Sequence, residues 1–249
     1  MIRSALALLL TVIPLGASPA SAQTADEIIA RSFEARGGLA KVKAILGLRM
    51  TGRATVAPGT EAPMTVEIQR PSSLRLEFTF DGKKAVQAFD GRQAWGIAPG
   101  EAQPRVLPAE AGRSMAQQTD LEGPLADHAQ KGHKIGLVGR EKLRGKDVWR
   151  LRVTRRDGDV EDHLIDATTY LPVLVSVERT VRGSTIHSET RFGDYRPIKG
   201  GYLWPFRLES GAAGRSERQV MQLEDVEVDP DLDVARFSMP GGRSSGRRY

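Results

Sequence analysis

Apolar and polar residues alternate with a period of two over much of this chain, and this pattern restricts the fold more than any other feature. The alternation covers residues 64–69, 74–80, 149–153 and 173–178. Successive side chains of a β-strand point to opposite faces, so each segment predicts a strand with one apolar and one polar face. Turn-forming pairs separate such segments at Asp81-Gly82, Asp90-Gly91, Asp157-Gly158 and Gly200-Gly201. We therefore expect about eleven or twelve strands in a long antiparallel meander.

Two regions depart from this alternation and predict helices. Thr24 and Glu27 have the spacing of a capping box, and Gly37-Gly38 ends the helix that follows and lets a second, short helix begin. Between residues 99 and 134, apolar residues recur every four positions at Leu107, Ala111 and Met115, and again at Leu121, Leu125 and Ala129. This region predicts one or two helices, broken near Gly123-Pro124.

A large antiparallel sheet with one apolar face must close on itself, pack on a second sheet or curl around helices. Helical segments at the start and in the middle of a single meander favour the third solution. The sequence therefore predicts a mainly β (α+β) fold, an incomplete antiparallel barrel curled around the N-terminal and central helices. Such a half-barrel can enclose a cavity.

The first 22 residues have the pattern of a secretory signal peptide. Arg3 precedes an apolar run over residues 5–15, and Ala20-Ser21-Ala22 supplies a cleavage site after Ala22. The apolar run is too short to predict a permanent membrane helix. The chain contains no Cys, so we expect neither disulfides nor a lipid on a cysteine after the cleavage site. These features predict a secreted protein with one domain over residues 23–239 and a disordered basic tail over 240–249.

The net charge of +5 does not predict a nucleic-acid partner. Export and the absence of a basic block in the domain argue against that class, whereas a mild preference for anionic lipid surfaces fits the charge better. No window after the signal peptide is apolar enough to predict a transmembrane segment.

Candidate catalytic and metal motifs fail the structural tests that their chemistry requires. Residues 242–246 match G-x-S-x-G but lie in the tail, without the strand and helix of a nucleophile elbow. Asp229, Asp231 and Asp233 could open a calcium loop, but Val234 and Pro240 stand where Gly and Glu are required. The histidines lack zinc-site spacing, and we expect them to be exposed and partly paired: His128, His133, His163 and His187. We therefore predict no catalytic residue, metal or cofactor.

Several segments resemble the LolA-like outer-membrane lipoprotein-sorting proteins. They are 25–29 (ADEII), 35–38 (ARGG) and 48–52 (LRMTG) near the start, and 192–196 (FGDYR), 200–205 (GGYLWP) and 237–240 (FSMP) near the end. The resemblance implies an incomplete antiparallel barrel lidded by helices, with a hydrophobic cavity for acyl chains. It also implies periplasmic localisation, with a role in lipoprotein transport or in sensing lipidated ligands. An arginine that locks the lid would correspond to Arg49 or Arg53.

Two sets of candidate site residues follow. Residues expected to line a lipid cavity are Leu76, Phe78, Phe80, Phe89, Trp95, Met115, Leu121, Leu125, Trp149, Leu151, Val175 and Val177. The alternative is that these apolar side chains form a closed core. Residues expected to dock a partner or lipid headgroups are Arg150, Arg152, Arg155 and Arg156, for which the alternative is a solvated outer face.

The leading functional hypothesis is a non-catalytic periplasmic carrier that moves the acyl chains of a lipoprotein or lipid toward the outer membrane. Its partners would be an inner-membrane transporter and an outer-membrane acceptor. A lipid- or lipoprotein-sensing module that regulates a partner protein is the alternative on the same scaffold. A periplasmic hydrolase is a third class, for which the sequence shows no nucleophile–base pair.

Overall fold

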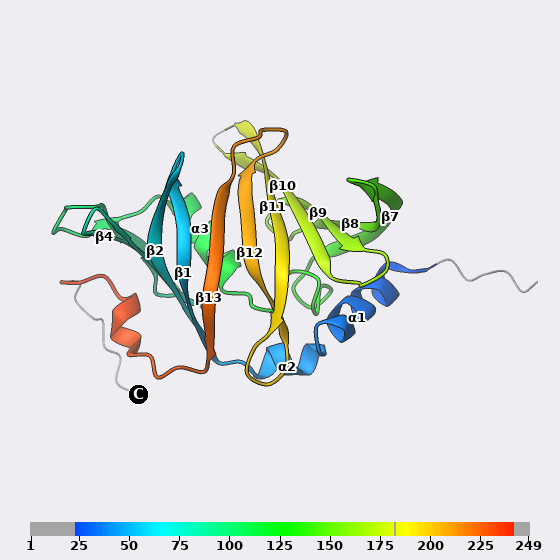
Figure 1. The fold of residues 1–249 in the computed structure, drawn as a ribbon, viewed down its shortest axis with the longest axis horizontal. Coiled ribbons are helices and arrows are strands. Elements are labelled where there is room, and N and C mark those ends of the chain that lie inside the picture. The colour runs from blue at the N-terminus through cyan, green and yellow to red at the C-terminus, as the bar shows by residue number, and fades with distance from the viewer. Residues whose placement is uncertain (1–22, 182, 242–249) are drawn as a thin grey trace, which may run out of the picture.

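The computed structural model describes residues 23–181 and 183–241, and a single curved sheet of thirteen strands dominates these residues (Figure 1). The strands are β1 Gly47–Ala57, β2 Thr60–Gln69, β3 Ser73–Phe80, β4 Lys83–Phe89, β5 Ala94–Ile97, β6 Arg105–Val106, β7 Lys134–Leu143, β8 Lys146–Thr154, β9 Val160–Asp166, β10 Pro172–Val181, β11 Ser184–Pro197, β12 Leu203–Ala212 and β13 Gln219–Val228. The helices are α1 Ala25–Ala35, α2 Leu39–Ala44, α3 Ala109–Gln118 and a short 3₁₀ turn, η1, at Val234–Phe237.

The sheet order shows how two meanders join. Strands run in the order β6-β5-β4-β3-β2-β1-β13-β12-β11-β10-β9-β8-β7, and neighbouring strands are antiparallel. The edge strands β6 and β7 do not pair with each other, so the sheet remains an open half-barrel. This confirms the fold class predicted from the sequence. Alternation does not predict β5 and β6, because these strands contain only four and two residues.

The N-terminal helices form as the sequence predicts. Thr24 and Glu27 make both hydrogen bonds of the capping box, with N–O distances of 3.0 and 3.2 Å. Gly37 then adopts a φ of +106°, and a Cβ there would lie 2.7 Å from the carbonyl oxygen of Gly201. Glycine is therefore required where the link between α1 and α2 passes the turn before β12.

Of the one or two helices predicted for the central region, one forms, and the prediction of a second helix is wrong. Helix α3 ends at Gln118, and residues 121–132 form successive turns in place of a helix. Gly123 and Asp127 have φ values of +74° and +49°, which a right-handed helix excludes. Lys131 closes the segment, because its Nζ lies 2.7 Å from Asp120 and donates to the carbonyl oxygen of Gly123 at 2.9 Å. The four-residue spacing of Leu121, Leu125 and Ala129, which predicted a helix, therefore belongs to a series of packed turns.

The main core lies between the concave face of the sheet and the helices. Ile28 and Phe33 of α1 pack into it together with Met115 of α3 and with inward residues of β1, β8 and β9. Figure 1 shows α1 and α2 along one end of the sheet and α3 on its concave side. No helix among the described residues combines the length and apolarity needed to cross a bilayer. The proposed signal peptide and the G-x-S-x-G match lie outside the described residues.

The segment after β13 covers part of the convex face and builds a second, smaller core. Trp95 is buried there with Val86 and Ala88, with Met239 packed against them, and its Nε1–H donates to the carbonyl oxygen of Phe237 at 2.7 Å. Asp229 fixes the start of this segment, since its Oδ1 accepts the backbone N–H groups of Leu46 and Gly47.

An ion-pair cluster fastens the same segment to the sheet. The buried carboxylate of Glu67 lies 3.0 Å from both Arg49 and Arg236, and Arg75 donates to the backbone carbonyl of Arg236 at 2.8 Å. Asp233 accepts the N–H of Ala235 and thereby begins η1. Two of the three aspartates that suggested a calcium loop therefore bond backbone N–H groups.

The hydrogen bond between Trp95 and Phe237 predicts a measurable contribution to stability. Trp95→Phe leaves the buried carbonyl oxygen of Phe237 without its donor, so we expect the free energy of unfolding in urea to fall by about 1–3 kcal/mol. Trp204→Phe is the control, because the half-buried Trp204 indole makes no hydrogen bond to the described residues. Equal losses in the two variants would contradict the role of the hydrogen bond.

Candidate functional site

A cavity of about 1020 Å³ occupies the concave side of the sheet. Its walls come from β1, β3, β4 and β9–β13, and α3 with the turns after it closes one side. Its apolar lining residues are Ala54, Val56, Leu76, Phe78, Leu121, Leu125, Val175, Val177, Val181, Ile186, Phe192, Leu208, Val220 and Met221. A volume of this size lies at the upper end of the range for small-molecule sites, which is about 300–1,000 Å³.

The structure divides the apolar residues that the sequence assigned to this cavity. Those that line it are Leu76, Phe78, Leu121, Leu125, Val175 and Val177. Phe89, Met115 and Leu151 are buried in the main core, and Trp149 packs against that core. Trp95 lies in the convex-face core, and Phe80 is 42% exposed at the end of β3. Alternation identifies the face of a strand, whereas the position along the strand decides between core, cavity and rim.

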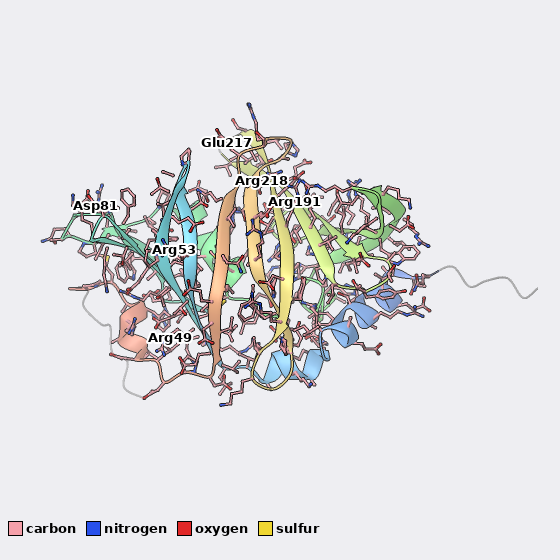
Figure 2. All side chains as sticks on the ribbon, in the orientation of Figure 1. Arg49, Arg53, Asp81, Arg191, Glu217 and Arg218 are labelled. Atoms are coloured by element: carbon pink, nitrogen blue, oxygen red, sulfur yellow. The ribbon has the colours of Figure 1, made fainter. Side chains whose placement is uncertain are left out.

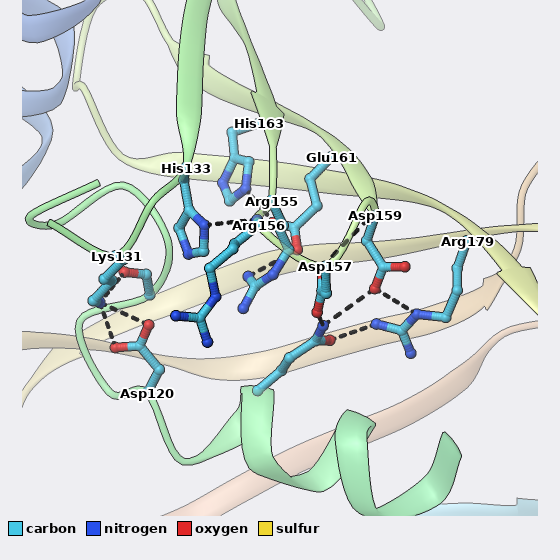
Figure 3. A network of polar contacts seen from close by, with 12 residues as sticks. Asp120, Lys131, His133, Arg155, Arg156, Asp157, Asp159, Glu161, His163 and Arg179 are labelled. Atoms are coloured by element: carbon cyan, nitrogen blue, oxygen red, sulfur yellow. Dashed lines mark hydrogen bonds and ion pairs between the residues drawn. The ribbon is translucent and has the colours of Figure 1, made fainter. Parts of the chain in front are cut away.

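A group of polar side chains that the sequence did not assign to the cavity forms one end of it (Figure 3). Glu161 and His163 project from β9 on its inward face, with side chains only 8% and 9% exposed. Their closest atoms, Oε2 and Nε2, are 2.7 Å apart. Arg155, in the turn between β8 and β9, donates from Nη1 to Oε1 of Glu161 at 3.0 Å. These three residues form a buried relay of hydrogen bonds at the cavity wall.

A second polar group attaches α3 to the same end of the cavity. Gln117, in the last turn of α3, donates from Nε2 to Asp157 at 2.9 Å and to Asp159 at 3.1 Å. Its Oε1 accepts a short hydrogen bond from Arg179 of β10, and Arg179 also donates from Nε to Asp159 at 2.7 Å. The side chain of Gln117 therefore connects α3 to the turn between β8 and β9 and to β10; Figure 3 labels its partners Asp157, Asp159 and Arg179.

The four arginines expected to dock a partner do not form one surface. Arg150 and Arg152 lie on the convex face of β8 and both pair with Asp162, Arg152 at 2.9 Å. Arg155 is buried at the cavity, and Arg156 is exposed. His163 also differs from the expected exposed histidine. The sequence carries a signal for this end of the cavity, because Glu161 and His163 share a strand face with the buried Ile165.

Neither candidate for the lid-locking arginine contributes to the cavity. Arg49 pairs with Glu67 at 3.0 Å and with Glu227 at 2.7 Å, and Arg53 pairs with Glu61 at 3.2 Å. Both residues belong to β1, and Figure 2 labels them. Ion pairs across neighbouring strands therefore occupy both guanidinium groups, and neither residue is among those that line the cavity.

Electrostatic balance keeps Glu161 ionised despite its burial. Burial by itself raises the pKa of Glu161, but the hydrogen bond and charge of His163 and the charge of Arg155 outweigh it, so the pKa lies below its ordinary value. His133 lies at the edge of the same region, and its Nδ1 accepts the backbone N–H of Arg156 at 3.2 Å. Burial, followed by the positive charges of Arg155 and Lys131, lowers the pKa of His133.

The lowered pKa of Glu161 predicts a pH dependence of stability. A carboxyl group with a depressed pKa in the folded state stabilises the protein above its unfolded pKa of about 4.3, and this stabilisation is lost as the pH falls through the folded pKa. We expect Glu161→Gln to be about 1–3 kcal/mol less stable at neutral pH and to show a shallower loss of stability below about pH 4.3.

The measurement is urea unfolding between neutral and acidic pH. The control is Glu224→Gln, because Glu224 is exposed and forms no ion pair with the described residues. It should retain the slope of the unchanged protein. An identical acid slope for Glu161→Gln and the unchanged protein would contradict the assignment.

Comparison with solved structures shows the fold. A LolA superfamily protein from Nitrosomonas europaea matches with a TM-score of 0.57 at 18% identity, covering 87% of this chain and 98% of the other. A domain described as outer-membrane lipoprotein-sorting, from Vibrio parahaemolyticus, matches with a TM-score of 0.55 at 14% identity, covering 85% and 95%. A DUF1329 family protein from Desulfovibrio piger gives 0.59 at 11% identity, covering 84% and 97%.

Sequence comparison adds no closer relative. No family model matches the chain, and no curated protein matches it. At identities below one fifth, the structural likeness concerns the fold, and it agrees with the resemblance seen in the sequence. The chain has the LolA-like fold.

Proposed function

We propose that this protein is a non-catalytic carrier that binds the acyl chains of a lipid or lipoprotein in the cavity of its half-barrel. The observation that carries the proposal is the cavity of about 1020 Å³ with its apolar lining. Transfer of an acyl chain out of water is worth about 0.8 kcal/mol for each CH₂ group. Walls of Leu, Val, Phe and Met provide this energy without directional bonds, so chains of different length can bind.

The polar contacts support binding in preference to catalysis. Among the described residues, His163 makes its side-chain hydrogen bond with Glu161, and no Ser or Thr hydroxyl bonds to a histidine. A nucleophile activated by histidine needs that contact. The hydroxyl groups of Thr190 and Ser210, which line the cavity, bond to each other at 2.9 Å.

The proposed localisation of the protein is the periplasm. The export signal over residues 1–22 and the lack of Cys support a secreted chain without a lipid anchor. A carrier there would receive its cargo from an inner-membrane transporter and deliver it to an outer-membrane acceptor. Arg150 and Arg152 on the convex face are candidates for docking to anionic headgroups, although Asp162 neutralises part of their charge.

Filling the cavity should weaken lipid binding. Val177 lines the cavity, whereas Ser176, the preceding residue of β10, is not among the lining residues and its side chain points to the opposite face. If Val177→Trp displaces two CH₂ groups of a bound chain, it costs about 1.6 kcal/mol, or roughly tenfold in affinity. Titration of the delipidated protein with cis-parinaric acid, a fluorescent fatty acid, measures this change.

Ser176→Trp is the matched control and should bind the probe with unchanged affinity. Circular dichroism establishes that both variants fold. Absence of probe binding by the unchanged, delipidated protein would reject the cavity as a lipid site. Equal affinities of the two variants would place the bound probe elsewhere.

Transfer between membranes separates a carrier from a sensor. We expect the protein to move a fluorescent diacylated lipopeptide from donor to acceptor vesicles at a rate proportional to protein concentration, and Val177→Trp to slow this transfer. Lipopeptide binding without transfer would favour the sensing module. Arg150→Gln combined with Arg152→Gln should slow transfer to anionic vesicles at low salt, because the variant loses two charges that attract anionic headgroups. High salt screens this attraction, so the difference from the unchanged protein should then disappear.

A further inference from the structure

The guanidinium of Arg155 differs in its hydrogen bonding from those of Arg152 and Arg179. Its side chain is nine-tenths buried, it lines the cavity, and it donates from Nη1 to Glu161 at 3.0 Å. Its Nε is buried and has no hydrogen-bond partner among the described residues. Nη2 likewise makes no hydrogen bond to the described residues, so the edge that carries Nε and Nη2 can donate to a ligand. A buried donor left unpaired destabilises the folded state, so such a group requires an explanation.

The Nε atoms of Arg113, Arg150 and Arg191 are also buried without a partner among the described residues, but of these four arginines Arg155 is the one that lines the cavity. Arg179 uses the corresponding edge fully, with Nε donating to Asp159 and Nη2 to Gln117. Arg152 on the convex face directs Nε and Nη2 to the two oxygens of Asp162, at 2.9 and 3.0 Å. This planar edge matches a group that presents two oxygens, as carboxylates do. At Arg155 the protein supplies the two N–H donors, Nε and Nη2. A ligand bound in the cavity would supply the oxygen that accepts from them.

The charges around Arg155 define the acceptor further. Glu161 pairs with Arg155 at 3.0 Å and Asp159 with Arg179 at 2.7 Å, so protein carboxylates already balance both cations. Beyond this polar end, Val175 and Val177 of β10 contribute apolar side chains to the cavity wall. A ligand that fits both features has a hydrocarbon chain and, at one end, a compact group whose oxygen accepts hydrogen bonds.

We infer that Arg155 anchors the acyl end of the bound chain, with its free edge donating to the carbonyl oxygen of a fatty acyl ester or fatty acid. This inference rests on the proposed lipid-binding function and adds the orientation of the ligand. The acyl carbon lies at the end of the cavity formed by Arg155, Glu161 and His163, and the hydrocarbon chain extends along the walls of β10–β13. Arg155 is thus a specificity residue that distinguishes an acyl group from other hydrocarbon chains.

The test combines one protein variant with ligands that differ at one carbonyl group. Arg155→Lys keeps a cation that can pair with Glu161 but removes the planar edge. The ligands are methyl decanoate, decanoate and decyl methyl ether, the last of which replaces the ester carbonyl by CH₂. Each competes with cis-parinaric acid on the delipidated full-length protein. Arg152→Lys, on the convex face of the same hairpin, is the matched control.

We expect the unchanged protein to bind methyl decanoate or decanoate about tenfold more tightly than the ether, the effect of one good hydrogen bond. Arg155→Lys should abolish this preference while changing ether affinity less than about twofold. Arg152→Lys should retain it. Comparison of the ester and acid identifies whether the acyl oxygen comes from an ester or a free carboxylate.

Two results would overturn the inference in different ways. Equal binding of the ester, the acid and the ether by the unchanged protein, or equal weakening of all three in Arg155→Lys, would reject the anchor but leave the lipid cavity intact. Failure of every ligand to displace cis-parinaric acid, or failure of that probe to bind, would reject the proposed function and the anchor together. Unfolding in urea confirms that Arg155→Lys folds.

Discussion

The pairing of β1 with β13 is the constraint on which the rest of the structure depends. It joins the first meander, β1–β6, to the second, β7–β13, with residues as distant in sequence as Leu48 and Val228 in register. The register shifts between Thr51 and Gly52, where a Cβ on Gly52 would lie 2.1 Å from the carbonyl oxygen of Gln222. Glycine at this bulge lets the strands approach and increases the local twist. Without this junction, neither meander encloses the cavity.

The two faces of the sheet differ in the interactions that cover them. The convex face carries cross-strand ion pairs, such as Arg49 with Glu227, and the segment after β13 covers Trp95 on that face. The concave face is filled by α1, α2 and α3 over only part of its area, and the remainder is the cavity. Exposed ion pairs contribute about 0–1 kcal/mol each, so the main core, the convex-face core and the strand pairing provide most of the stability.

The sequence predicts the fold well because two-residue alternation and turn pairs are local signals. It predicts the site less completely, since alternation cannot tell where along a strand the helices cease to fill the half-barrel. Trp95 illustrates the limit, because its indole is buried by a segment that follows about 140 residues later, through Phe237. Glu161 and His163 illustrate the opposite case, in which a local pattern does identify the inner face. The sequence predicts an exposed His163 and assigns no role to Glu161, yet the buried Ile165 shares their strand face and marks it as the inner one.

Binding and release place opposite demands on such a cavity, and the distribution of polar groups addresses both. Apolar walls give an affinity that grows with chain length but set no orientation. Polar contacts at one end can set the orientation while each adds only about 0.5–1.5 kcal/mol, because water competes for the same hydrogen bonds in the unbound state. Gln117 connects α3 to Asp159 and Arg179 beside this end. A ligand that reaches Arg155 therefore lies next to the contacts that hold the helix over the cavity, where binding and helix position can influence each other.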